Sequence, residues 1–188
     1  MTTLWVLLAA VAILGVWVAL LYNSLVRNTN LAAEGLSGVD VQLTRRSELV
    51  PNLVEAVKGY MAHERGLLQS IAELRAKSLA AKDTGERLQA EGLLGQALGK
   101  VMALAEAYPE LKASANFLEL QRSLSEIESE LQLARRYYNG AARNLNIAVD
   151  SFPSNLVARA FGFSRAQYFE AEDDARREPP KVDFRKPD

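Results

Sequence analysis

Residues that could carry out chemistry are few in this sequence. The 188 residues include a single histidine, His63, and no cysteine, which excludes thiol catalysis, disulfides and the usual zinc cluster of cysteine and histidine ligands. His63 precedes Glu64 and follows Glu55 in the same segment, so it could form a general acid–base pair with either carboxylate. Asp40 and Glu48 are the other acidic candidates.

A solvated helix surface explains these residues more simply than catalysis does. Glu55 and Lys58 have the spacing of a local ion pair on a helix. No motif adds a nucleophile and an orienting carboxylate, and GLLGQALG (residues 92–99) lacks the preceding strand of a phosphate loop. The sequence therefore predicts no enzyme, metal or cofactor. Its 22 basic and 23 acidic residues are nearly balanced, so no nucleic-acid partner is expected.

The most informative element is an uncharged segment from Leu4 to Tyr22. A helix of this length rises about 28 Å, close to the hydrocarbon thickness of a bilayer. The sequence predicts a membrane anchor over residues 1–23, with an aromatic side chain near each lipid–water boundary. The anchor residues are Leu4, Trp5, Leu8, Val11, Leu14, Trp17, Leu21 and Tyr22.

A cleaved signal peptide is the alternative for this segment. Such a peptide has a basic start and a small-residue cleavage site after its apolar run. Here the start is Met-Thr-Thr, and the A-x-A pattern at residues 10–12 lies in the middle of the run. We therefore expect the segment to be retained. Arg27 follows the span and no Lys or Arg precedes it, which favours an outer N-terminus and a cytoplasmic domain.

Two long stretches place apolar residues at alternating steps of three and four, from Leu36 to Ser78 and from Phe117 to Phe152. This spacing is typical of helices that bury one stripe against their neighbours. The first stripe includes Arg46 and Glu64, which are candidates for polar pairing between helices or subunits. Extension of both side chains to the surface of the domain is the simpler explanation. Strand patterns are almost missing, so the predicted fold class is all-α.

Proline and capping residues mark the predicted breaks. Asp83 starts a predicted helix over residues 86–107 through a capping box, and Tyr108–Pro109 ends it. Pro51, followed by Asn52, falls inside the first stretch, where a proline costs about 3 kcal/mol. The apolar phase is unchanged across it, which favours one long helix that continues from the span and is kinked at Pro51. A turn at Pro51, which would give four shorter helices, is the alternative.

A short aromatic segment, residues 152–169, follows the second stretch. The sequence predicts a short amphipathic helix ended by Gly162, and the segment is a candidate contact for a partner or the membrane. Folding of this segment back over the bundle is favoured. The contact candidates are Phe152, Pro153, Arg159, Phe161, Phe163, Tyr168 and Phe169. Residues 170–188 are charged and proline-bearing, which predicts an extended tail.

Several motifs in one order resemble the LemA family of bacterial membrane proteins from residue 1 to the end. They are YNSLVR, DVQLTRRSELVPNLVEAVKGYMAHE, AYPELKASANFLELQ, ARRYYNGAARNLN and FPSNLVARAFGFSRAQYFEAE with PPKVDF. The resemblance implies an antiparallel bundle, usually of four helices, over residues 24–151. It also implies a single N-terminal span in the bacterial cytoplasmic membrane, and no reaction. One branch of the family is associated with magnetosome membranes, and other members neighbour a membrane protease.

These features favour a self-associating scaffold that organises or shapes the membrane. A rigid rod that leaves a span transmits its packing angle to the bilayer, and association of copies multiplies the effect. Membrane lipid and further copies of the chain are then the expected partners. The alternative is an adaptor that docks a membrane protease or a remodelling ATPase through residues 152–169.

Overall fold

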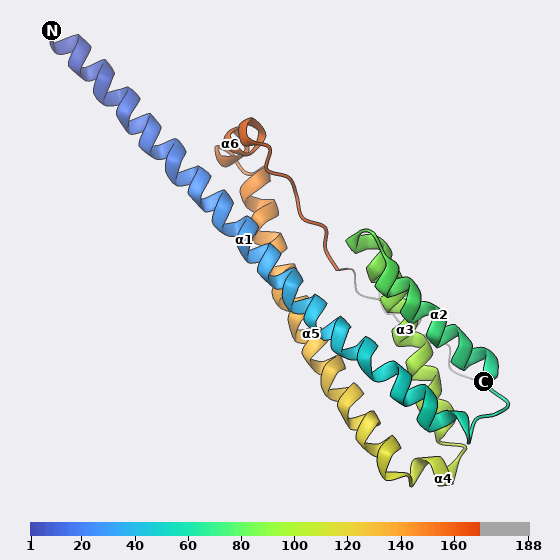
Figure 1. Ribbon diagram of the computed structural model, residues 1–188. Helices are drawn as coiled ribbons and strands as arrows, with labels where there is room; N and C mark the ends of the chain where they lie inside the picture. The colour runs from blue at the N-terminus through green and yellow to red at the C-terminus, as the bar shows by residue number, and fades with distance from the viewer. Residues whose placement is uncertain (170–188) are drawn as a thin grey trace, which may run out of the picture.

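The computed structural model describes residues 1–169, and helices make up almost all of this part of the chain (Figure 1). No strand occurs within residues 1–169, so the all-α prediction is confirmed. Four long helices form the bundle, as the resemblance implies. The helices are α1 (Thr2–Lys58), α2 (Arg65–Ala80), α3 (Thr84–Ala105), α4 (Pro109–Lys112), α5 (Ala115–Asp150) and α6 (Ser154–Phe161).

The long axis of the molecule is the antiparallel pair of α1 and α5, which lie side by side along most of α5 (Figure 1). The two helices approach closely at Gly35. A Cβ atom on Gly35 would lie 2.9 Å from the Cα atom of Tyr138, so only glycine fits at this crossing without a shift of the backbone. Ala32 and Ala141 are buried in the same region.

The α2–α3 hairpin packs against the part of α1 and α5 farthest from the N-terminus (Figure 1). This distal bundle holds the main apolar core, to which α1, α2, α3, α4 and α5 all contribute. The buried residues are Val50, Leu53, Val57, Met61, Leu68, Ile71, Leu94, Ala97, Leu98, Val101, Ala105, Leu111 and Phe117.

α1 passes through Pro51 and Asn52 without a turn, but it does not continue to Ser78. The chain reverses over residues 59–64, where the Val57 carbonyl accepts the backbone N–H groups of Tyr60 and Met61 at 3.0 and 2.9 Å. The prediction of one helix through the whole first stretch is therefore wrong. The heptad spacing continues across the reversal because the apolar stripes of α1 and α2 are both buried in the same core.

Pro51 is tolerated because another side chain replaces the hydrogen bond that it removes. Proline has no N–H, so the carbonyl four residues earlier, on Ser47, loses its helical donor. Arg75 on α2 donates its Nε–H to the Ser47 carbonyl at 2.8 Å. The α2–α3 hairpin thus satisfies a buried backbone group of α1.

Other predicted breaks lie within a few residues of the observed ones. Asp83 caps α3 by accepting the Glu86 N–H at 2.9 Å. α3 ends at Ala105, and Pro109 occupies the first turn of α4, where its missing N–H is not needed. α5 begins at Ala115, after Ser114.

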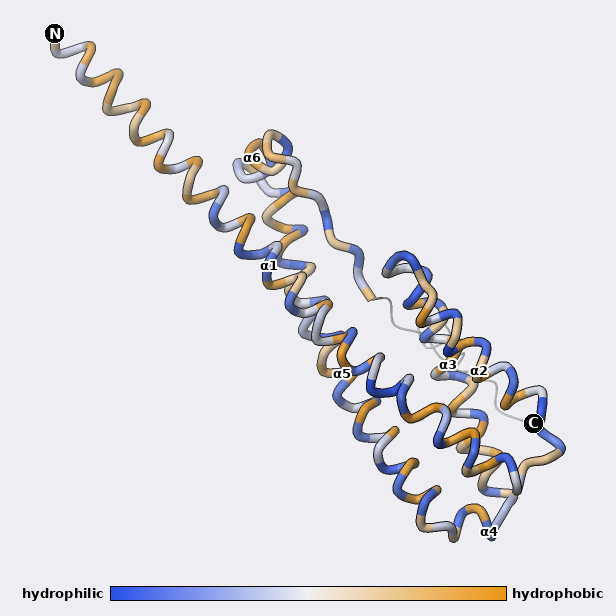
Figure 2. Tube along the Cα trace, in the orientation of Figure 1, coloured by the Kyte–Doolittle hydropathy of each residue, from blue (hydrophilic) through white to orange (hydrophobic). Residues whose placement is uncertain are grey.

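The N-terminal part of α1 extends beyond the rest of the structure and is apolar along its length (Figure 2). Among the described residues, one helix is long and apolar enough to cross a membrane, and none of its most apolar window is buried in the protein. Trp5 is 69% exposed and Trp17 is 43% exposed. A membrane location fits this arrangement, because the protein itself provides no cover for these side chains.

Candidate functional site

The first part of the candidate site is α6, which lies beside α1 where the apolar extension begins (Figure 1). Val157 and Ala158 of α6 are buried with Leu25 of α1. Gly162 ends α6 with a φ of 76°, a left-handed conformation that favours glycine. The predicted short helix and its terminator are confirmed.

An aromatic cluster joins α6 to the anchor. The ring of Tyr22 meets Phe161 edge-on with 4.9 Å between centroids, and it meets Phe163 in the same way at 5.6 Å. Such pairs contribute about 0.5–1.5 kcal/mol beyond the area that they bury. The structure thus brings together one predicted anchor residue and two predicted contact residues that are more than a hundred positions apart in the sequence.

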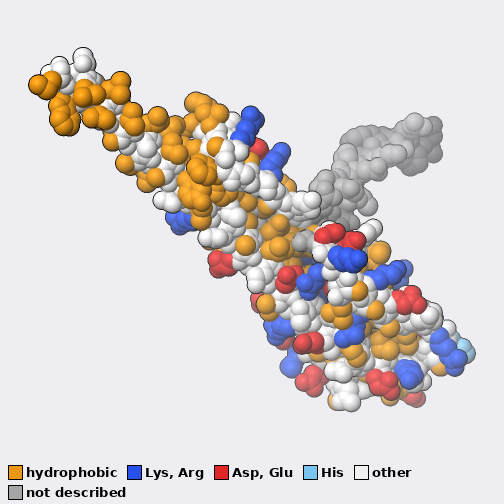
Figure 3. Space-filling model, turned by 45° about the horizontal axis from the view of Figure 1, so that its top comes forward, with side chains coloured by type: hydrophobic (Ala, Val, Ile, Leu, Met, Phe, Trp, Pro, Cys, Tyr) orange, Lys and Arg blue, Asp and Glu red, His pale blue; other side chains and the backbone are white. Residues whose placement is uncertain are grey.

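Other predicted contact residues remain at the surface of this end. Phe152 is 79% exposed and Phe161 is 58% exposed, while Pro153 is half-buried. Arg159 is exposed on α6. Figure 3 shows apolar side chains running from the N-terminal extension onto the adjoining end of the domain, with basic groups beside them. This end therefore offers apolar and cationic groups together.

The second part of the site is an extended segment, residues 163–169, which we term the strap. Two asparagines of α5 bind its backbone through both amide atoms. Asn146 accepts the Ala166 N–H at 2.8 Å and donates to the Ala166 carbonyl at 2.9 Å. Asn139 binds the N–H and carbonyl of Phe169 in the same way, both at 2.9 Å.

The two asparagines are spaced along α5 by nearly the same distance as the two strap residues that they bind. Asn139 and Asn146 are seven positions apart on a helix, which is about 10.5 Å. Ala166 and Phe169 are three positions apart in an extended chain, which is about 10 Å. The strap consequently runs antiparallel to α5 in a fixed register. Neither asparagine was predicted from the sequence, although each directly follows a residue of the apolar stripe of α5, Tyr138 or Leu145, at a spacing of seven.

Tyr138 adds a third contact and an aromatic pocket for the end of the strap. Its hydroxyl donates to the Gln167 carbonyl at 2.7 Å, and its ring meets that of Phe169 edge-on at 5.0 Å. The guanidinium of Arg135 lies 5.9 Å from the Phe169 ring centroid. Burial raises the pKa of the Tyr138 phenol above its ordinary value. Phe169 is buried, whereas Tyr168 is 43% exposed.

The third feature is a charge cluster inside the distal bundle. Arg46 is only 3% exposed, so the expectation that it extends to the surface is wrong. It forms ion pairs with Glu91, which is 1% exposed, and with Glu128 at 3.1 Å. Ser78 donates a hydrogen bond to the second oxygen of Glu91. Glu64 is not part of this cluster, because it occupies the N-cap position of α2.

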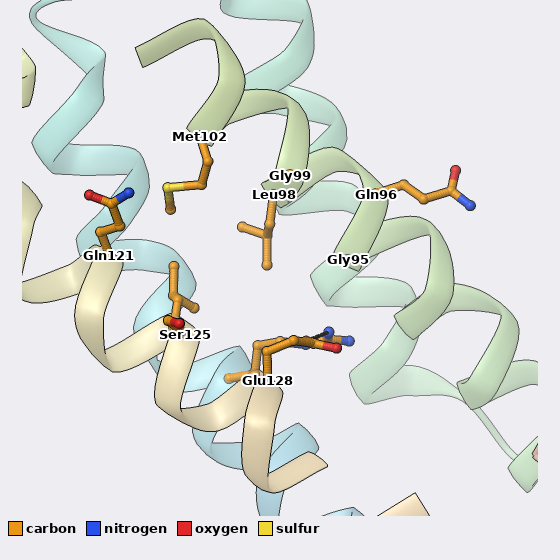
Figure 4. A pocket seen from close by; sticks show the side chains of 10 residues that line it. Gly95, Gln96, Leu98, Gly99, Met102, Gln121, Ser125 and Glu128 are labelled. Atoms are coloured by element: carbon orange, nitrogen blue, oxygen red, sulfur yellow. Dashed lines mark hydrogen bonds and ion pairs between the residues drawn. The ribbon is translucent and has the colours of Figure 1, made fainter. Parts of the chain in front are cut away.

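A groove of about 410 Å³ opens beside this cluster, between α3 and α5. Figure 4 shows Leu98 and Met102 of α3 directed toward α5, with Glu128 at one end of the space. Gly95 and Gly99 of α3 line the groove and have no side chains to fill it. A Cβ atom on Gly95 would lie 3.3 Å from a guanidinium nitrogen of Arg46. Arg46 thus lies close to Gly95 and forms part of the lining of the groove.

The acidic and histidine candidates are not gathered into a site. His63 is exposed in the loop between α1 and α2, and Glu48 is exposed on α1. Glu55 lies 3.7 Å from Lys58, which is the local ion pair predicted from their spacing. Asp40 pairs with Arg87 at 3.0 Å. Within residues 1–169, no three carboxylate or histidine side chains are grouped in a way that could hold a metal ion.

The sequence profile of the LemA family matches residues 35–184, which is most of the chain and nearly all of the bundle. The chain belongs to the LemA family. This LemA chain is also similar to magnetosome protein MamQ 1 of Paramagnetospirillum magneticum, with 28% identity over 175 residues. The match covers 79% of this chain and 64% of that relative.

Two further relatives give the same picture. Magnetosome protein MamQ of Magnetospirillum gryphiswaldense is 26% identical over 174 residues, which cover 79% of this chain and 64% of the relative. Protein LemA of Metamycoplasma hominis is 26% identical over 152 residues, covering 80% of this chain and 69% of the relative. The chain thus spans just under two thirds of the length of these magnetosome proteins.

Proposed function

We propose that this LemA-family chain is a membrane-anchored scaffold that self-associates and organises or shapes the bacterial cytoplasmic membrane. One observation carries the proposal. α1 is a single helix from Thr2 to Lys58, so the apolar extension and the wall of the bundle are one rod without a flexible linker. The tilt of the extension therefore fixes the orientation of the bundle relative to the bilayer. Relatives that are named magnetosome proteins fit a role at membranes.

A surface suited to self-association lies on α5. Leu133, Tyr137 and Ile147 follow one side of the helix and are 49, 50 and 56% exposed. Their spacing places them on one stripe of a helix. Because α5 runs along the anchor rod, copies that associate through this stripe can keep their spans side by side in one membrane. The proposal assigns no reaction and no cofactor to the chain.

The test is the mass of the full-length protein in mild detergent and in nanodiscs over a range of concentrations. We expect oligomers, which Leu133→Arg and Ile147→Arg reduce toward monomers. Leu79→Arg, at an exposed residue of α2, is the matched control and should leave the mass unchanged. A strict monomer at every concentration would remove the assembly on which the scaffold depends.

The orientation follows from the distribution of charge around the span. Arg27 is the first charged side chain after the apolar extension, and no basic side chain precedes it, which favours an N-terminus outside and a bundle in the cytoplasm. Protease treatment of intact spheroplasts tests this arrangement. Protection of the bundle is expected, and its digestion would reverse the orientation.

An adaptor for a membrane protease or a remodelling ATPase is the second candidate. It is favoured by Phe152 and Phe161, which remain exposed although the strap that follows them in the chain is bound to α5. Crosslinking followed by co-purification should recover such a partner from the native chain and lose it with Phe161→Ala. Phe163→Ala is the companion variant, because Phe163 is half-buried. If both variants keep the same partners, this surface is not the docking site.

A further inference from the structure

α6 lies at the level where the apolar part of α1 ends. Val18 and Leu21, both within the predicted span, pack against the cluster that contains the buried face of α6. A helix rises about 5.4 Å per turn, so contact with Val18 places α6 about one turn inside the end of the span. Among the described elements that follow α1, α6 is therefore the one placed at the lipid boundary.

Three large apolar side chains at this level have little protein cover. Phe152, Leu156 and Phe161 are 79, 57 and 58% exposed. Apolar surface in water costs about 25 cal/mol per Å², and lipid removes that cost without any change in the fold. Phe161 contacts Tyr22 at the end of the span, which needs the same apolar medium. This continuity favours lipid over a protein as the occupant of the surface.

Cationic groups stand beside these side chains. Arg27, five residues after Tyr22, and Arg159, on α6, are both exposed. Neither forms an ion pair with any residue in the described part of the chain, whereas Arg165 pairs with Asp150 at 3.5 Å. Guanidinium groups bind phosphate oxygens strongly, and basic groups at a membrane surface are attracted to anionic lipids.

We propose that α6 is an interfacial helix embedded in one leaflet of an anionic bilayer. Phe152, Leu156 and Phe161 enter the acyl boundary, and Arg159 binds headgroup phosphates. The inference rests on the anchor of the proposed function but not on self-association. Each copy would then add apolar volume to one leaflet beside its span, which gives a single copy a means of biasing curvature.

The test uses the absence of cysteine from the sequence. Phe152→Cys and Leu156→Cys each allow one nitroxide label on the full-length chain, reconstituted in nanodiscs that hold one copy. Leu118→Cys is the matched control, since Leu118 is 49% exposed but lies at the far end of α5. Electron paramagnetic resonance then compares collision with oxygen, which concentrates in lipid, against collision with a water-soluble nickel chelate.

We expect a several-fold higher ratio of oxygen to nickel collisions at 152 and 156 than at 118. Addition of phosphatidylglycerol to phosphatidylcholine should raise the ratio further, and Arg159→Gln should abolish that increase. The belt protein that encloses the disc is the other protein present, so the labels are also measured in liposomes of the same lipids, which have no belt. Protection that recurs in the liposomes must come from lipid. Labels at 152 and 156 as open to nickel as the label at 118 would overturn the proposal. An equal ratio in both lipids would overturn the role of Arg159. Neither outcome depends on whether copies associate, so failure of the scaffold is recognised separately by the mass measurement.

Discussion

The two ends of this domain are held together by different means. The distal bundle packs large aliphatic side chains from five helices around a buried Arg46–Glu91 pair. The membrane-proximal stalk is essentially two helices, α1 and α5, which approach closely at Gly35 and are covered by α6 and the strap. Apolar volume and charge compensation stabilise the first region. Close backbone approach and hydrogen bonds from asparagine stabilise the second.

This difference follows from the number of helices available at each end. Four long helices enclose a core from all sides, so large side chains are buried and even a charged pair is shielded from water. Two helices alone cannot enclose large side chains on every side, so their backbones come together at Gly35. Large buried side chains of the stalk, such as Leu25 and Val39, are covered by α6 and the strap. The stalk then gains cover from a segment bound through its own backbone groups. Substitutions in one region should therefore act by a different mechanism from substitutions in the other.

The largest expected effect is in the distal bundle, from Glu91→Ala. Removal of Glu91 leaves the buried guanidinium of Arg46 with only the half-exposed Glu128 as its partner, and breaking a buried ion pair costs about 3–5 kcal/mol. Pulse proteolysis of the full-length protein in urea should show this loss in the free energy of unfolding. Glu128→Ala is the control, because Glu128 is 46% exposed and should cost clearly less. Equal losses from both variants would mean that burial of the pair is not what matters.

In the stalk, Gly35→Leu should be the most damaging change. The new side chain meets the Tyr138 backbone, and overpacking of this kind costs about 1–3 kcal/mol. Gly38 is the matched control, since no heavy atom lies within 4 Å of a Cβ placed there. Gly38→Ala should raise stability by up to about 1 kcal/mol, because alanine has the higher helix propensity. Changes of opposite sign in the free energy of unfolding of the two variants would show that the helices approach closely at Gly35 and not at Gly38.

The next effect returns to the distal bundle, at the proline in α1. Arg75→Leu leaves the Ser47 carbonyl without a donor, which costs about 1–3 kcal/mol for a buried group. In a Pro51→Ala background the helix supplies its own N–H to this carbonyl, so the same substitution should cost much less. A double-mutant cycle measures the difference. Equal costs in both backgrounds would show that Arg75 acts through packing alone.

A smaller and local effect is expected for the strap. Asn146→Ala removes two hydrogen bonds to Ala166, each worth about 0.5–1.5 kcal/mol. Hydrogen exchange at Ala166 and Phe169 should accelerate, and trypsin should cleave faster after Arg165, while global unfolding changes little. Asn144→Ala, at an exposed asparagine of the same helix, is the control. Unchanged exchange in Asn146→Ala would mean that the clamp does not hold the strap.

The smallest effect concerns pH. Because burial raises the Tyr138 pKa above about 10, the unfolded chain loses this proton first as the pH rises. The contribution of this pKa difference to the free energy of unfolding is fully present below about pH 10. It is lost as the pH rises through the pKa of Tyr138 in the folded state. Strap protection should therefore decline at high pH in the native chain. This decline should disappear in Tyr138→Phe and persist in Tyr137→Phe, whose ring is 50% exposed in the native chain.

The fold was largely predictable because its determinants are local or periodic. The span, the seam of α5 and the Gly162 terminator all follow from residues close together in sequence. The reversal at residues 59–64 was not predictable from the heptads, because apolar phase reports which face is buried and not whether a helix is continuous. Arg46 was misjudged for a related reason. Its two partners come from segments whose alignment no local pattern specifies.

The charge cluster also sets an order of events during synthesis. Glu91 and Glu128 follow Arg46 by 45 and 82 positions, so the ribosome releases the arginine long before either carboxylate. Until then its guanidinium has to stay in water, and the seam around it cannot close. Completion of the distal core is thereby tied to the arrival of α5, and a chain cut short before Glu128 cannot shield its arginine.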